Sequence, residues 1–134
     1  MKNITFTKDL PTAEEVVELR TQCDWDGDLD EWEKCLTQNL LSISARDDSN
    51  KLIGFGCLSG NQRHAEVVDL VVLASYRKEG VASKILDEIV EFAISNKIKY
   101  LGLTYNKNSP WLKDFYEKHG FQSINTAMWH KNSL

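Results

Sequence analysis

The stretch of sequence that decides the fold is residues 69–82, DLVVLASYRKEGVA. Its Val- and Leu-rich beginning belongs to a run that predicts a strand over Ala65–Leu73, buried on both faces. Its end leads into Gly80–Asn96, where apolar residues recur at helical spacing and predict an amphipathic helix. A further strand is predicted at Ile98–Leu103. Strand, helix and strand make a βαβ unit, so we expect these two strands to be parallel, with a right-handed crossover.

The entry to the Gly80–Asn96 helix is suited to bind a pyrophosphate. The first amides of a helix have no partners within the helix, and its N-terminus carries a positive partial charge. Gly80 permits a phosphate to approach the backbone, and Arg77 adds charge-assisted hydrogen-bond donors. A single glycine at such a junction is a weak signal on its own, and a simple connection is the alternative.

The rest of the chain supplies further elements and no linker, which predicts one domain over residues 1–134. Thr12 and Glu15 have the spacing of a capping box at the start of a helix. Ser109 and Pro110 are typical of an N-cap and first helical position, and Gly120 of the end of that helix. The remaining predictions are strands at Asn3–Thr7, Leu41–Ala45, Leu52–Leu58 and Phe121–Lys131, and a short helix at Asp30–Gln38.

Composition excludes several classes of protein. The chain has 134 residues and a net charge of −4, which disfavours a nucleic-acid partner because phosphate contacts need clustered Lys and Arg. No apolar run is long enough to span a bilayer and the N-terminus lacks a signal-peptide pattern, so we expect a cytoplasmic protein without a membrane partner. Cys23, Cys35 and Cys57 match no zinc or redox spacing, and the three histidines are scattered. We therefore expect reduced cysteines and no metal site.

Two motifs resemble those of one family. Residues 77–82, RKEGVA, fit the Arg/Gln-x-x-Gly-x-Gly/Ala pattern of the GCN5-related N-acetyltransferase (GNAT) superfamily. Residues 115–121, FYEKHGF, resemble its Tyr-Glu-Lys-x-Gly-Phe motif near the C-terminus. The order of the predicted elements also matches, so the resemblance covers essentially the whole chain. The sequence departs from the pattern at Lys78, where the family usually has glycine, and at Glu79, where a basic residue is common.

The resemblance implies a fold and a cosubstrate. The fold is α/β (α+β by some schemes), a mixed, mostly antiparallel sheet of about six strands with a splayed parallel pair and about four helices. The cosubstrate is acetyl-CoA, whose pantetheine arm would pair with the backbone of Leu70, Val71 and Val72. The residues implied around its pyrophosphate are Arg77, Lys78, Glu79, Gly80, Val81, Ala82 and Ser83. Asn108, or alternatively Asn106, would lie against the cofactor or cap a turn.

The resemblance also implies catalytic roles. A primary amine must lose its proton before it attacks a thioester, which calls for a general base or a water. Glu66 and Asp69 are the candidates, and we favour Glu66. They lie three positions apart, so on a regular strand they face opposite sides of the sheet. Tyr116 matches the family's general acid, and an amide of residues 70–72 would stabilise the charge on the carbonyl.

The acceptor is suggested only by the segment after the first helix. Trp25, Asp26 and Trp32 lie in an acidic, indole-bearing stretch that suits a cationic small-molecule amine. The alternative is a solvated loop whose tryptophans pack into the core. Two other functions stay open, a protein acetyltransferase acting on Lys or N-terminal amines and a non-catalytic CoA-binding module. The family also suggests a homodimer, with Trp129 of the last strand at the interface.

Overall fold

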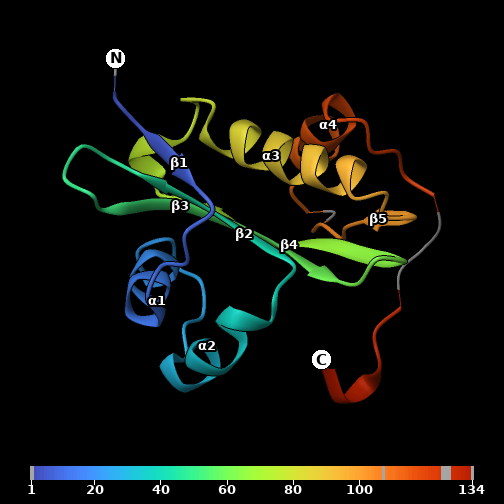
Figure 1. Cartoon of the computed structure of the whole chain (residues 1–134), viewed down its shortest axis with the longest axis horizontal. Coiled ribbons are helices and arrows are strands. Elements are labelled where there is room, and N and C mark those ends of the chain that lie inside the picture. The colour runs from blue at the N-terminus through green and yellow to red at the C-terminus, as the bar shows by residue number, and fades with distance from the viewer. Residues whose placement is uncertain (1, 107, 125–127, 134) are drawn as a thin grey trace. The chain divides into compact units, whose positions relative to one another are not determined.

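The computed structural model describes residues 2–106, 108–124 and 128–133. The chain forms two compact units, Met1–Gly102 and Leu103–Leu134. Figure 1 shows the helices and strands along the chain. The first unit contains the whole sheet and three of the α-helices. The second contains one α-helix and its flanking segments.

The sheet of the first unit has five strands in the order β1-β2-β3-β4-β5. Each neighbouring pair is antiparallel except β4 and β5, which are parallel, as the βαβ pattern predicts. The mixed α/β fold is thereby confirmed. The strands are β1 (Thr5–Thr7), β2 (Leu41–Arg46), β3 (Leu52–Gly60), β4 (His64–Val72) and β5 (Tyr100–Gly102).

Helices cover both faces of this sheet. Helices α1 (Ala13–Gln22) and α2 (Leu29–Cys35), the latter continued by a 3-10 turn at Leu36–Gln38, lie on one face, and α3 (Val81–Ser95) lies on the other (Figure 1). On the α1 side, Trp32 packs edge-on against Phe55 with ring centroids 6.1 Å apart. On the α3 side, a Cβ on Gly56 would lie 2.8 Å from Ile85, so glycine is required for α3 to approach the sheet this closely.

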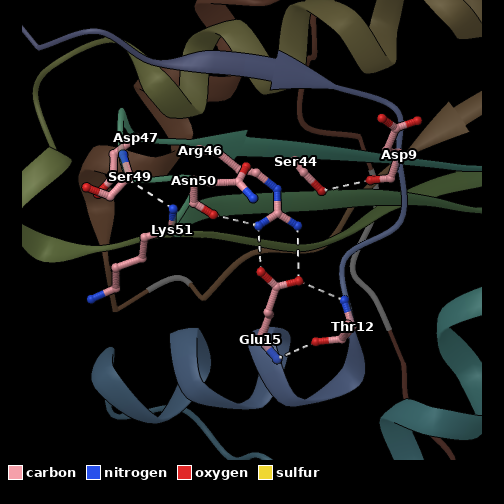
Figure 2. A network of polar contacts seen from close by, with 9 residues as sticks. All are labelled: Asp9, Thr12, Glu15, Ser44, Arg46, Asp47, Ser49, Asn50 and Lys51. Carbon is pink, nitrogen blue, oxygen red and sulfur yellow. Dashed lines mark hydrogen bonds and ion pairs between the residues drawn. The ribbon is translucent and has the colours of Figure 1, made fainter.

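A polar network fixes the start of α1 to β2. The Thr12 hydroxyl accepts from the Glu15 amide, and a Glu15 carboxylate oxygen accepts from the Thr12 amide, which is the capping box that the sequence predicts. The same carboxylate accepts two hydrogen bonds from Arg46 of β2, at 2.5 and 3.0 Å (Figure 2). Arg46 also donates to the carbonyl of Asn50, so the network joins α1 to the β2–β3 hairpin.

The second unit is built around α4 (Pro110–Lys118), which begins with proline at its first turn, as predicted. The predicted final strand at Phe121–Lys131 is wrong for the described residues of that segment, because residues 121–124 and 128–130 lie in no strand. Residues 125–127 lie outside the described residues. The physical reason is that the apolar residues Ile124, Met128 and Trp129 are all exposed, so the segment has no buried face to hold it as a strand.

Candidate active site

Strand β4 pairs with its parallel neighbour, β5, over only three pairs of residues. His64, Ala65 and Glu66 pair with Tyr100, Leu101 and Gly102, and β5 then ends. Among the described residues, 67–72 of β4 therefore have a strand partner only on the β3 side. A strand edge of this kind leaves backbone donors and acceptors available to an extended ligand. The parallel pairing of these strands is confirmed, and their splaying stays a prediction.

Strand β4 also contains a bulge. Val68 lies opposite Cys57 and Val71 lies opposite Phe55, so Asp69 and Leu70 together face the single residue Gly56. Asp69 adopts a φ of +57°, the left-handed conformation found at the first position of one bulge type. Aspartate tolerates this conformation better than most residues.

The bulge overturns the expectation that Glu66 and Asp69 face opposite sides of the sheet. Glu66 pairs with Ser59, which has the same orientation on β3 as Phe55 and Cys57 of the α1-side core. Asp69 contacts Arg20 of α1 and therefore faces the same side. One extra residue between the two positions shifts the strand's alternation, and both carboxylates lie on the face that α1 and α2 cover.

Glu66 lines a shallow depression on this face. The depression has a volume of about 210 Å³ and lies at the end of the β3–β4 hairpin. Its lining residues are Ser59, Gly60, His64, Glu66 and Val68. His64 also packs edge-on against Tyr100 of β5, with ring centroids 6.4 Å apart. Glu66 is therefore an accessible carboxylate beside the point where β4 and β5 separate.

Asp69 is held in an ion pair instead. Its Oδ1 accepts from Arg20 Nη1 at 3.1 Å, and its side chain is 34% exposed. Burial raises the pKa of the Asp69 carboxyl above its ordinary value, and the Arg20 charge opposes that rise. Arg20 is a residue that the sequence analysis missed. The available signal was its place four residues after the buried Val16, on the apolar stripe of α1.

The three predicted acceptor residues have different surroundings. Trp32 is buried in the core, which agrees with the alternative reading for that tryptophan. Trp25 is 41% exposed, and the Asp26 side chain is 84% exposed. Both contact Arg20, Trp25 with its ring 5.0 Å from the guanidinium carbon and Asp26 through its carboxylate at 2.8 Å. Trp25 and Asp26 thus stay available to a ligand, whereas Trp32 is structural.

The loop between β4 and α3 carries two left-handed residues. A 3-10 turn at Ala74–Tyr76 is followed by Lys78 with a φ of +68° and Gly80 with a φ of +79°. This explains why a glycine is usual at the Lys78 position, because glycine adopts this conformation without steric cost. Arg77 Nε donates to the Val72 carbonyl at 3.1 Å, so its side chain folds back toward the end of β4.

The start of α3 is suited to an anion. Helices α1 and α2 each have two acidic residues in the first turn, whereas α3 has none. An acidic residue normally stabilises a helix N-terminus, so a first turn without one keeps that positive end for another negative group. A Cβ on Gly80 would meet no atom within 4 Å, and Glu79 is exposed. The first turn of α3 therefore has no acidic side chain of its own, and no atom crowds Gly80.

Tyr116 belongs to the second unit, on α4. Its ring lies 5.1 Å from Phe115 and 6.1 Å from both Tyr105 and Phe121, measured between centroids. Burial raises the pKa of the Tyr116 phenol above its ordinary value of 10.0. Asn106 caps a turn, because its Oδ1 accepts from the Asn108 amide at 2.9 Å.

Two of the three cysteines have thiols that are poor nucleophiles. Burial raises the pKa of the Cys35 thiol, and it raises that of Cys57 to about 12, so neither forms a thiolate nucleophile at neutral pH. Within the described ranges, no group of three or more His, Cys, Asp or Glu side chains is placed to hold a metal ion. Among the same residues, no helix is long and apolar enough to cross a membrane.

Comparison with solved structures gives matches along nearly the whole chain. A protein of unknown function from methicillin-resistant Staphylococcus aureus, described as a probable acetyltransferase, is 25% identical with a TM-score of 0.84 and covers 96% of this chain and 99% of its own. A GNAT family acetyltransferase from Streptococcus pneumoniae is 22% identical with a TM-score of 0.76, covering 98% of both chains. Glucosamine-6-phosphate N-acetyltransferase from Arabidopsis thaliana shares the fold at 15% identity, with a TM-score of 0.77 and coverage of 96% and 97%.

Comparison by sequence gives one family. A comparison with curated proteins gave no significant match. The model of the acetyltransferase (GNAT) family matches residues 5–121, which include β4, the loop to α3 and the segment around Tyr116. That match extends over most of the 134 residues, so the chain belongs to the GNAT family of acetyltransferases.

Proposed function

We propose that the protein transfers an acetyl group from acetyl-CoA to the primary amine of a small cationic molecule. The observation that carries the proposal is the unpaired edge of β4 at residues 67–72, which leads through one short loop into the acid-free first turn of α3. The strand edge can hydrogen-bond an extended pantetheine arm, and the helix N-terminus can bind a pyrophosphate. The family match over residues 5–121 supports treating 1–134 as one acetyltransferase domain.

The chain's own residues have the following proposed roles. The backbone of Leu70, Val71 and Val72 binds the pantetheine amides and stabilises the charge on the thioester carbonyl. Glu66, directly or through a water, takes a proton from the ammonium, and the neutral amine then attacks the carbonyl carbon. Tyr116 gives a proton to the sulfur as the C–S bond breaks. We favour Glu66 over Asp69 as base because Arg20 holds Asp69 in an ion pair.

The acceptor is proposed from Trp25 and Asp26. Arg20 contacts both side chains, but its single positive charge is shared between the carboxylates of Asp26 and Asp69. The exposed carboxylate of Asp26 and the exposed indole of Trp25 can therefore still attract an ammonium group by charge and by cation–π contact. Both lie in the segment between α1 and α2, on the same face of the sheet as Glu66. A Lys or N-terminal amine of a protein is the alternative acceptor.

The cosubstrate site is tested by titrating acetyl-CoA into the protein by calorimetry. Ala82→Glu puts a carboxylate in the first turn of α3, where it is expected to weaken binding at least about tenfold through repulsion of the pyrophosphate. The same charge stabilises a helix N-terminus, so lost binding does not result from unfolding. Ser95→Glu is the matched control, because it adds the same charge about 20 Å further along the helix.

Two results would contradict the cosubstrate site. The first is that the unmodified protein binds no acetyl-CoA at near-millimolar concentration. The second is that Ala82→Glu binds as tightly as Ser95→Glu. The acceptor is tested separately, by measuring thiol release with spermidine, tyramine and a lysine-containing peptide. Turnover of the peptide alone would replace the small amine by a protein acceptor.

The homodimer stays a prediction. The strand proposed to carry Trp129 into an interface is not formed by the described residues. Trp129 itself is exposed, and sedimentation velocity would show whether the protein is a dimer.

A further inference from the structure

Arg20 is a buried cation whose three nitrogens all have partners. Its side chain is 8% exposed, in the last turn of α1. Nε donates to the Asp26 carbonyl at 2.7 Å, and Nη2 donates to Asp26 Oδ1 at 2.8 Å. Nη1 donates to Asp69 Oδ1 at 3.1 Å. The guanidinium carbon also lies 5.0 Å from the ring of Trp25 and 5.2 Å from that of Trp32.

Stability alone does not account for this arginine. A buried ion pair is often no more stabilising than apolar residues of similar volume, because desolvation offsets the attraction. Arg20 lies beside the apolar residues Val16 and Leu19 on the buried face of α1, where an apolar side chain would also fit. What the guanidinium adds is geometry, since its planar fork fixes the directions of its partners.

Asp69 is the partner whose backbone conformation has to be stabilised. Its φ of +57° lies in the left-handed region, which costs a residue with a side chain roughly 1–2 kcal/mol. Such a conformation persists where surrounding contacts over-determine it. Arg20 provides that contact from outside the sheet, and Gly56 is the single residue opposite the bulge on β3.

We propose that Arg20 is a positioning residue for acetyl transfer. By holding the Asp69 side chain, it keeps the left-handed backbone of the β4 bulge and thereby aims the amides of the following residues, 70–72, at the thioester carbonyl. The inference rests on the proposed function, which assigns these amides to acetyl-CoA. Because Arg20 also holds Asp26 and Trp25, the same side chain joins the acceptor segment to the bulge.

The test compares the affinities for acetyl-CoA and for CoA, measured by calorimetry. CoA lacks the acetyl group, so the ratio of the two affinities reports the contacts of the carbonyl and its methyl group, and only the carbonyl can accept a hydrogen bond from residues 70–72. We expect the unmodified protein to prefer acetyl-CoA about fivefold, the effect of one hydrogen bond. Arg20→Met is expected to bring this preference close to one while the affinity for CoA changes less than about twofold.

A glycine at position 69 distinguishes positioning from a general loss of structure. Glycine adopts the left-handed conformation without an anchor. The double variant Arg20→Met/Asp69→Gly is therefore expected to recover the preference that Arg20→Met loses, as a double-mutant cycle would show. Arg46→Met is the matched control, because it breaks another arginine–carboxylate pair that anchors α1 and lies outside the site. It is expected to keep the preference.

Each outcome decides the proposal. An undiminished preference in Arg20→Met overturns it, as does a double variant without recovery, because Arg20 then acts by a route other than the backbone of Asp69. Equal affinity of the unmodified protein for both ligands also overturns it. Failure to bind either ligand contradicts the proposed function instead. If circular dichroism shows that Arg20→Met is unfolded, Arg20→Lys, which keeps the charge and loses the fork, is measured with and without Asp69→Gly under the same criteria.

Discussion

At the scale of single residues, the left-handed backbone of Lys78 should lower the stability of the folded state. Its φ of +68° is unfavourable for any residue with a Cβ. Lys78→Gly is expected to raise the free energy of unfolding by up to about 1 kcal/mol, because the relief of strain exceeds the entropy that glycine adds to the unfolded chain. Urea unfolding measures the change.

Two further substitutions bracket the result for Lys78. Lys97 also has a left-handed φ, +56°, just after α3, so Lys97→Gly should act in the same direction. Glu91→Gly, in the interior of α3, should instead destabilise by about 1 kcal/mol, since glycine is unfavourable in a helix. A Lys78→Gly variant as unstable as Glu91→Gly would show that the left-handed conformation carries no strain.

Glu66 is the other residue for which a sharp result is expected. Glu66→Gln removes the proton acceptor while keeping the size of the side chain. We expect kcat to fall about 100-fold or more, within the range of general base catalysis, with little change in acetyl-CoA affinity. Steady-state rates on whichever amine the screen identifies measure this. A fall of less than about threefold would show that water alone, or a group other than Glu66, removes the proton from the amine.

At the scale of elements, the polar network that joins α1 to β2 should make the free energy of unfolding depend on pH. The hydrogen bonds from Arg46 hold the pKa of Glu15 at about 2, against an ordinary value of 4.5. A lowered pKa in the folded state means that the contribution is complete above about pH 4.5 and is lost as the pH falls toward 2. The side chain is 32% exposed, so solvent screening reduces this contribution to about 1 kcal/mol.

Glu15→Gln tests this dependence. We expect the variant to be about 1 kcal/mol less stable than the unmodified protein at pH 7, and the difference to shrink as the pH approaches 2. Urea unfolding at a series of pH values measures it. Glu14→Gln, in the same helical turn, is the control and should leave the acid dependence as it is. If the two unfolding free energies differ by the same amount at every pH, the charge of the carboxylate does not stabilise the polar network.

At the scale of the whole molecule, the cosubstrate should stabilise the fold by mass action. A ligand that binds only the native state adds about 2.7 kcal/mol at a concentration 100 times its Kd. For a chain of 134 residues we expect acetyl-CoA at that excess to raise Tm by several degrees. Differential scanning fluorimetry measures this, with Ala82→Glu at the same concentration as control. A shift of equal size in that variant would locate binding away from the start of α3.

Elements that depend on neighbours in the sequence were predicted well. The capping box of Thr12 and Glu15, the apolar stripe of α3 and the proline start of α4 are local patterns, and all three form as expected. The parallel pairing of β4 and β5 also followed, because a helix between two strands permits few connections. The strand predicted at Phe121–Lys131 does not form among the described residues, since apolar residues make a strand only where the rest of the fold buries one face.

The sequence by itself determined the family, the order of the elements as far as α4 and the segments expected to bind the cosubstrate, since each rests on local motifs or on short-range periodicity. The tertiary structure alone decided that Glu66 and Asp69 share a face, because a bulge exists only when β4 is counted against β3. It also decided that Arg20, 49 residues away in sequence, holds Asp69. The bulge leaves no periodic signal in the chain, and the place of Arg20 on the apolar stripe of α1 indicates its burial but not its partner. Both features result from pairing between segments that are distant in sequence.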